Sequence, residues 1–132
     1  MIQLFEQKRA WGKLVELLKD KNEKIRASAI ESLGNLRIKK TQAYLKEQYQ
    51  YENNDNKLLI INALSKFKNI HNLVFFKHII EEEDKNVWLQ VEAAKGIREI
   101  GVDGKKELNG LLDSEEYRNY QIIIKHVLDE RL

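Results

Sequence analysis

The 132-residue chain is long enough for one domain with a continuous core, and its 42% apolar and 33% charged residues are the balance of a folded globular protein. It has no cysteine, which excludes disulfides, thiolate zinc sites and cysteine nucleophiles. No apolar run approaches the roughly 18 residues of a membrane span, and a net charge of +2 is not that of a broadly basic protein.

Helices are predicted throughout the chain. Apolar residues recur at spacings of three and four, there is no proline, and the six glycines offer few breaks. Taken in chain order, the pattern predicts four helical pairs: 10–19 with 22–36, 39–51 with 55–68, 70–82 with 86–101, and 104–113 with 115–130. No stretch has the alternation of a strand, so the expected fold class is all-α.

The second helices of the pairs repeat one apolar pattern. Ala29, Ala63 and Ala93 occupy its centre, where a small residue lets a neighbouring helix approach closely. Shifts of 34 and then 30 residues superpose these five positions of the first three units: Ile25, Ala29, Ile30, Leu33 and Leu36; Leu59, Ala63, Leu64, Phe67 and Ile70; Leu89, Ala93, Ala94, Ile97 and Ile100.

These units predict a single repeat domain over 1–132. One helical pair cannot bury its apolar face alone, whereas stacked pairs can. The units extend over about 10–36, 39–68, 70–101 and 104–130. The last one matches the pattern only in part, as is typical of a terminal repeat.

The stretch DKNEKIRASAIESLGNL resembles a HEAT repeat, whose second helix follows an aspartate and runs through a β-branched residue, an arginine, alanines and Leu-Gly. Six positions match one by one: Asp20, Ile25, Arg26, Ala29, Leu33 and Gly34. The resemblance implies a right-handed α-α superhelix, a solenoid of about four HEAT-like helical pairs. It also implies a non-enzymatic scaffold or adaptor that binds a protein partner on its concave face.

The sequence carries no motif of the common enzyme classes and predicts no catalytic residue, metal or cofactor. His71 and His78 lie seven residues apart on one helix face, but two imidazoles do not complete a metal site. The run EEED, Glu81 to Asp84, lacks the spaced ligands and glycine of a cation loop. We therefore expect Asp84 to cap the helix that follows.

The partner face is predicted from the repeat register. In a solenoid, the non-core positions of the second helices face a partner. Tryptophan and arginine are favoured anchors at interfaces. The predicted face consists of Leu58, Trp88, Arg118, Asn62, Glu92 and Ile122. The alternative for Trp88 is a place in the core, as is common for tryptophan.

The last helix predicts a second surface because its apolar stripe is wide. Ile124 is expected on the inward face of this helix, and the apolar residues continue round the helix beyond that face to Tyr117, Tyr120 and Leu128. A wide apolar face at a terminus favours a homodimer or docking onto another chain. The alternative is a short cap folded tightly on the neighbouring unit.

The charge distribution leaves nucleic-acid backbone binding as the alternative function. Residues 1–66 carry 13 Lys and Arg against 8 Asp and Glu, whereas residues 67–132 carry 10 against 13. Arg37, Lys39 and Lys40 form a small basic cluster, with Lys24, Lys57 and Lys66 in the same half. Phosphate binding requires a continuous basic stripe, so nucleic acid is the less favoured partner.

The sequence also suggests a location. The absence of cysteine fits a cytoplasmic protein. The apolar residues Ile2, Leu4 and Phe5 precede the first pair without a polar cap. We therefore expect either a cytoplasmic protein or the cytoplasmic domain of a longer, membrane-anchored one.

Overall fold

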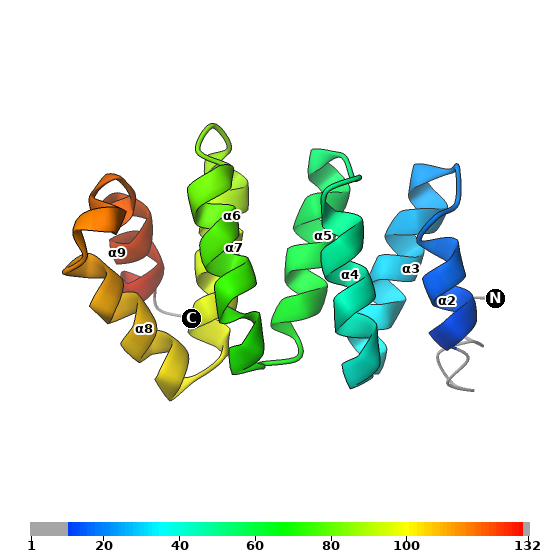
Figure 1. Cartoon of the computed structure of the whole chain (residues 1–132), viewed down its shortest axis with the longest axis horizontal. Helices are drawn as coiled ribbons and strands as arrows, with labels where there is room; N and C mark the ends of the chain where they lie inside the picture. Colours follow the sequence, from blue (N-terminus) through cyan, green and yellow to red (C-terminus); the bar gives the residue numbers. More distant parts are fainter. Residues whose placement is uncertain (1–10, 131–132) are drawn as a thin grey trace. The chain divides into compact units, whose positions relative to one another are not determined.

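The computed structural model describes residues 11–130, which contain eight α-helices, three short 3-10 segments and no strand (Figure 1). The all-α prediction is confirmed. Backbone contacts divide the chain into two compact units, Met1–Phe67 and Lys68–Leu132. Each unit holds two of the predicted helical pairs. The apolar residues Ile2, Leu4 and Phe5, and the first residue of the predicted unit 10–36, lie outside the described range.

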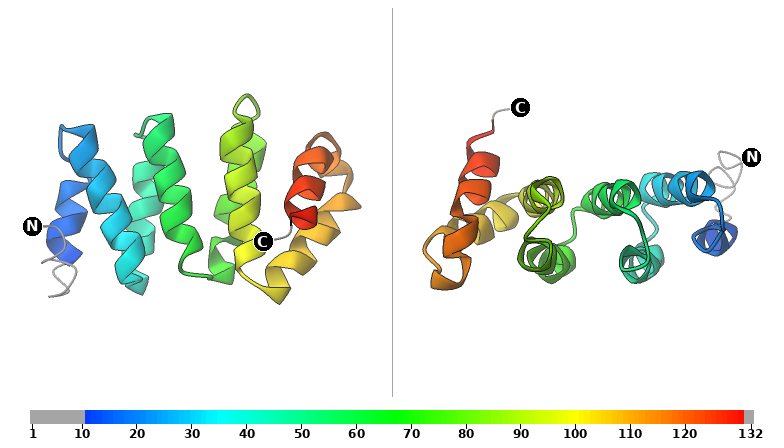
Figure 2. Two further views of the ribbon diagram at one scale, coloured as in Figure 1. Left: turned by 180° about the vertical axis from the view of Figure 1, so that it is seen from behind. Right: turned by 90° about the horizontal axis from the view of Figure 1, so that it is seen from above.

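The first unit consists of two antiparallel helical pairs. Its elements are α2 (Trp11–Leu17), α3 (Glu23–Leu36), η1 (Lys39–Thr41), α4 (Gln42–Tyr49) and α5 (Asn54–Ser65). Within this unit, α2 and α4 form one layer and the longer α3 and α5 form the other (Figure 2). The second helices therefore pack side by side, as the repeat register predicts.

The second unit is built around one central helix. Its elements are η2 (Ile70–Asn72), α6 (Leu73–Glu82), α7 (Val87–Glu99), α8 (Val102–Leu112), η3 (Glu115–Tyr120) and α9 (Gln121–Asp129). Helix α7 packs against α6, α8 and α9. One face of α7 is left to the solvent, and this face positions the candidate site.

Asparagine caps fix the start of three second helices. The side chains of Asn22, Asn53 and Asn86 accept hydrogen bonds from backbone N–H groups in the first turns of α3, α5 and α7. Such a bond satisfies one of the N–H groups that a helix start leaves unpaired. The prediction that Asp84 caps α7 is wrong, because Asn86 occupies that position.

The repeated alanines lie in the core as the register predicts. Ala29 and Ala93 are fully buried, and Ala63 is 2% exposed. Two outer positions of the pattern differ, since Ile25 is 37% and Ile70 41% exposed. Ile25 lies in the first turn of α3 and Ile70 lies beyond the end of α5, where fewer neighbours cover a side chain.

Gly34 lies where the two second helices of the first unit approach each other closely. A Cβ atom at this position would lie 2.8 Å from both Cα and Cβ of Ala63 on α5. Real Cβ contacts are essentially never this short. The glycine of the Leu-Gly step is therefore required by the packing of α3 on α5.

We expect Gly34→Ala to lower the free energy of unfolding by about 1–3 kcal/mol, because the added methyl must push α3 and α5 apart. Urea denaturation followed by circular dichroism measures this loss. Gly12→Ala is the matched control, because no atom of residues 11–130 lies within 4 Å of the Cβ position at Gly12 on α2. Equal stability of Gly34→Ala and Gly12→Ala would contradict the close packing.

The predicted helix 115–130 is interrupted in the structure. Residues 115–120 form the 3-10 segment η3, and Tyr117 inside it has a non-helical backbone (φ −106°, ψ 17°). Only Gln121–Asp129 are α-helical. The helix is interrupted because the ring of Tyr117 is buried and its hydroxyl donates a hydrogen bond to Glu81 on α6.

Candidate functional site

Trp88 projects from the first turn of α7 into the solvent. Its side chain is 75% exposed, and that of the adjacent Val87 is 59% exposed. The next two residues face inward: Leu89 is fully buried, and the buried Gln90 amide donates to the backbone carbonyl of Ile80 at 2.8 Å. These contacts fix the rotation of α7, so the indole is a surface group and not part of the core.

The face of α7 that begins at Trp88 continues as a line of charged residues. Lys95 Nζ lies 3.7 Å from Glu92 and 3.5 Å from Glu130, which follows α9. Arg98 donates to the backbone carbonyl of Val127 at 3.1 Å. These bonds join the carboxyl-terminal ends of α7 and α9, which lie side by side.

Helix α9 and the segment before it contribute the remaining predicted residues of the second unit. Ile122, in the first turn of α9, is 85% exposed. The side chain of Arg118 is 72% exposed and donates to Glu115 at 2.9 Å. Trp88, Arg118 and Ile122 are therefore open to a partner, while Glu92 is half-buried.

The other two predicted residues of the partner face belong to the first unit. Asn62 on α5 is exposed and lines an open pocket of about 390 Å³ with Glu31 and Lys66. Leu58 is half-buried. Helix α5 packs against both α3 and α4.

The predicted carboxyl-terminal docking face needs a correction at Tyr117. This residue is 1% exposed, so the expectation that it lies on an open face is wrong. Its ring packs edge-to-face with Tyr120 at 5.6 Å and lies below Lys77, and its hydroxyl donates to Glu81. Tyr120 and Leu128 are half-buried. Burial and the neighbouring Glu81 charge raise the pKa of Tyr117 well above its ordinary value.

A buried carboxylate network joins the two helical pairs of the first unit. The carboxylate of Glu52, just after α4, accepts hydrogen bonds from Arg26 Nε at 2.9 Å, Gln48 Nε2 at 2.9 Å and Asn56 Nδ2 at 3.1 Å. Arg26 also donates to the backbone carbonyl of Asp20 at 2.9 Å. Glu52 is 8% exposed, so these three donors replace its water.

The pKa of Glu52 is held below its ordinary value by these partners. Burial by itself raises the pKa of a carboxyl, because it penalises the charged form. The hydrogen bonds from Arg26, Gln48 and Asn56, together with the Arg26 charge, outweigh burial and lower it. A carboxylate held in this way is a weak base, which suits a structural ion pair better than a catalytic group.

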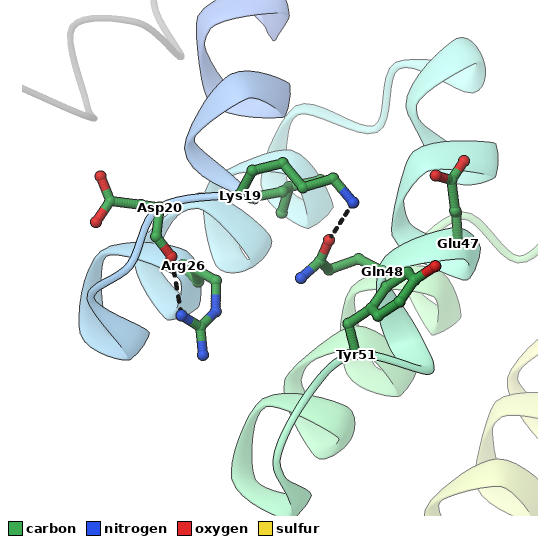
Figure 3. Close-up of a pocket in the computed structure, with 7 residues that line it drawn as sticks. Lys19, Asp20, Arg26, Glu47, Gln48 and Tyr51 are labelled. Atoms are coloured by element: carbon green, nitrogen blue, oxygen red, sulfur yellow. Dashed lines mark hydrogen bonds between the residues drawn. The ribbon is translucent and has the colours of Figure 1, made fainter.

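An open pocket of about 380 Å³ lies over this network (Figure 3). Lys19 reaches across the pocket and donates to the side-chain oxygen Oε1 of Gln48 at 2.9 Å, and its Nζ lies 5.2 Å from the ring centre of Tyr51. The pocket is lined by Leu18, Lys19, Asp20, Arg26, Glu47, Gln48 and Tyr51. Lys19 and Arg26 already donate hydrogen bonds to other residues of the protein. We therefore interpret this pocket as part of the packing between the two helical pairs and not as a ligand site.

Among the described residues of the first unit, the cations that the sequence singles out are spread over several elements. Lys24 lies in the first turn of α3, whereas Arg37 follows its last residue, a separation of roughly 20 Å along the helix. Lys57 lies 5.0 Å from the ring centre of Tyr49, and Lys66 donates to Asn35 at 2.6 Å. This distribution does not favour the alternative of nucleic-acid backbone binding.

No three His, Asp or Glu side chains among residues 11–130 gather as metal ligands would. His78 lies 3.7 Å from Glu82, and both are exposed. Burial lowers the pKa of Lys46, but Lys46 does not line the pocket of Figure 3. No helix in the described part of the chain is long and apolar enough to cross a membrane.

Sequence reasoning missed the partners of Glu52. Arg26 was recognisable as a repeat position, but Glu52 and Gln48 lie outside the aligned second helices. A spacing signal exists, since Gln48, Glu52 and Asn56 follow one another at intervals of four. However, Gln48 lies on α4, Glu52 in the turn after it and Asn56 on α5, so this spacing does not define one helical face and does not reveal that the three side chains meet in the interior.

A family model described as HEAT repeats matches residues 11–89, more than half of the chain. Neither curated proteins nor solved structures gave a significant match.

Proposed function

The chain belongs to the HEAT-repeat family, and from that premise we propose that it is a non-enzymatic scaffold that binds a protein partner through the exposed face of α7 and α9. HEAT repeats commonly mediate protein–protein interaction, and the family is generally non-catalytic. The all-α structure has the helical pairs of such a solenoid. The handedness of the superhelix stays a prediction.

The exposed indole of Trp88 is the observation that carries this proposal. A tryptophan supplies a large, rigid contact area, and few such side chains account for most of the energy at interfaces. At 75% exposure, Trp88 contributes little to the core and leaves most of that area to a partner. Ile122, 85% exposed on the neighbouring helix, adds a second apolar contact.

The rigidity of the supporting helices favours binding. Gln90 and Leu89 hold α7 to the core, and Arg98 ties it to the end of α9. A preformed surface loses little conformational entropy when a partner docks. The proposal places the protein in the cytoplasm, where a chain without cysteine needs no oxidising conditions.

We expect Trp88→Glu to abolish retention of the partner without unfolding the protein. The side chain is exposed, so Trp88→Ala and Trp88→Glu should change the free energy of unfolding by no more than about 0.5 kcal/mol. Retention is measured by affinity capture from a lysate of the source organism, with mass spectrometry of wild type and variant side by side. Circular dichroism confirms that each variant is folded.

Two other exposed valines provide matched controls. Val74 on α6 is 75% exposed and Val102 on α8 is 81% exposed. Val74→Glu and Val102→Glu add the same charge to the same unit and should leave retention unchanged. A partner that survives Trp88→Glu, or that is lost equally from all three variants, would overturn the proposed face. A stability loss above about 2 kcal/mol in Trp88→Ala would contradict its exposure.

A further inference from the structure

The end of the second unit beside Trp88 concentrates negative charge. Segments 81–85 and 113–118 hold seven carboxylates and two cations, Lys85 and Arg118. The turn between α6 and α7 and the segment before α9 lie at the same end of the unit, at the top of Figure 1. We call the seven carboxylates the acidic end: Glu81, Glu82, Glu83, Asp84, Asp113, Glu115 and Glu116.

A specific contact holds the two acidic segments together. The hydroxyl of Tyr117 donates to the carboxylate of Glu81, and this buried tyrosine belongs to η3 while Glu81 belongs to α6. Burying a hydrogen-bonded tyrosine between like-charged segments opposes their repulsion. The fold therefore keeps two acidic segments close together that would otherwise repel each other.

Several members of the acidic end have no structural partner. Asp84 does not cap α7, since Asn86 does. Asp84, Asp113 and Glu116 are exposed and form no ion pair with any residue between 11 and 130. Arg118 pairs with Glu115 in the second segment, and Lys77 on α6 lies over the ring of Tyr117. These carboxylates are therefore free to attract a cation from another molecule.

Trp88 lies in the first turn of α7, separated from the first acidic segment by Asn86 and Val87. The face of an indole is electron-rich and binds ammonium and guanidinium groups, preferably guanidinium. A cationic side chain is therefore complementary to this surface in two ways: it can stack on the electron-rich indole, and it is attracted by the unpaired carboxylates. Neither feature suits a nucleic acid, because the carboxylates repel phosphate.

We propose that Trp88 and the acidic end bind an arginine-bearing, basic segment of the partner protein, with a guanidinium group over the indole and the carboxylates supplying the charge complementarity. This inference rests on the proposed function and names the chemistry of the partner. It goes beyond an apolar contact at Trp88, because binding should require both the aromatic ring of Trp88 and the negative charge of the acidic end, and the two requirements can be tested one at a time.

The probe is a fluorescein-labelled peptide in which arginines are separated by Gly-Ser spacers, and its affinity is measured by fluorescence anisotropy. We expect binding to weaken roughly tenfold in Trp88→Leu, which keeps an apolar side chain but removes the aromatic face, and much less in Trp88→Tyr. Affinity should also fall with added salt, because exposed charges are screened. The same peptide with glutamine in place of arginine should not bind.

The charge requirement is tested with two matched double variants. Asp84→Asn with Glu116→Gln removes two charges from the acidic end, and Asp103→Asn with Glu107→Gln removes two exposed charges from α8. Both change the net charge equally. We expect several-fold weaker peptide binding only in the first pair. Equal weakening in both pairs, or no peptide binding by the wild type, would overturn the inference.

The outcomes distinguish this inference from the proposed function. If Trp88→Glu loses the captured partner but Asp84→Asn with Glu116→Gln retains it, the proposed partner face is supported and the inference of a basic segment is wrong. If the partner is retained by all of these variants, both the proposed face and the inference are wrong. If the protein alone dimerises in sedimentation, and Trp88→Leu abolishes the dimer, the occupant is a second copy of the chain and the inference is wrong.

Discussion

Replacing Glu52 by alanine is expected to lower the free energy of unfolding by about 3–5 kcal/mol, the usual cost of removing one partner from a buried ion pair. The carboxylate satisfies Arg26, Gln48 and Asn56 at once, and all four groups are buried or half-buried. Without it, a guanidinium and two amides remain away from water with donors unpaired. Urea denaturation of wild type and variant measures the loss.

Glu47 provides the control for this prediction. It lies on α4, the helix that ends shortly before Glu52; it is exposed and lines the pocket of Figure 3 without joining the network. Glu47→Ala should change the free energy of unfolding by no more than about 0.5 kcal/mol. If Glu52→Ala lowered the free energy of unfolding as little as Glu47→Ala, the network would not stabilise the fold. The packing between the two helical pairs would then depend on apolar contacts alone.

The lowered pKa of Glu52 adds a pH dependence of defined sign. The unfolded carboxyl titrates near its ordinary pKa of about 4.3, and the folded one titrates below it. The stabilisation is therefore fully present above about pH 4.3 and is lost as the pH falls through the folded pKa. In Glu52→Gln this contribution is absent, so the stability difference between wild type and variant should shrink on acidification.

Replacing Gly104 by alanine is expected to lower the free energy of unfolding by about 2–3 kcal/mol through overpacking. A Cβ atom there would lie 1.8 Å from the backbone carbonyl oxygen of Ile97 and 3.0 Å from Cβ of Ile100. Because the first of these is a backbone atom of α7, no rotamer change can relieve the contact. Helix α8 must shift on α7, which loosens the packing of the second unit.

Gly110 lies on the same helix and provides the matched control. Nothing lies within 4 Å of its Cβ position, so Gly110→Ala should be neutral or stabilising by up to about 1 kcal/mol, since alanine favours helix. Thermal and urea denaturation of both variants separate the contact from helix propensity. Destabilisation by both substitutions, or by neither, would contradict the close approach of α8 to α7.

The interrupted last helix shows how tertiary contacts override a local pattern. The apolar spacing of 115–130 is helical throughout, and α9 follows it. Tyr117 nevertheless leaves the helix because burial of its ring and the bond to Glu81 outweigh the continuation of the backbone hydrogen bonds. Sequence reasoning placed Tyr117 on an open face for the same reason, since it treated the segment as one helix.

The candidate site was accessible to sequence reasoning only in part. Register identified Trp88 as a non-core position but could not exclude its burial, which depends on how α7 is rotated against the core. The buried amide of Gln90 and its bond to Ile80 fix that rotation. Leu58, at the equivalent position in the first unit, is half-buried instead.

The sequence by itself determined the all-α class, the four helical pairs and the family, because apolar periodicity and the Asp20 to Gly34 pattern are local properties of the chain. Element bounds agree within about three residues, except where η3 interrupts the last helix. Only the tertiary structure decided which polar groups are buried and which apolar groups are not. Glu52 is covered and Trp88 is exposed, since burial depends on contacts between distant segments that no local spacing specifies.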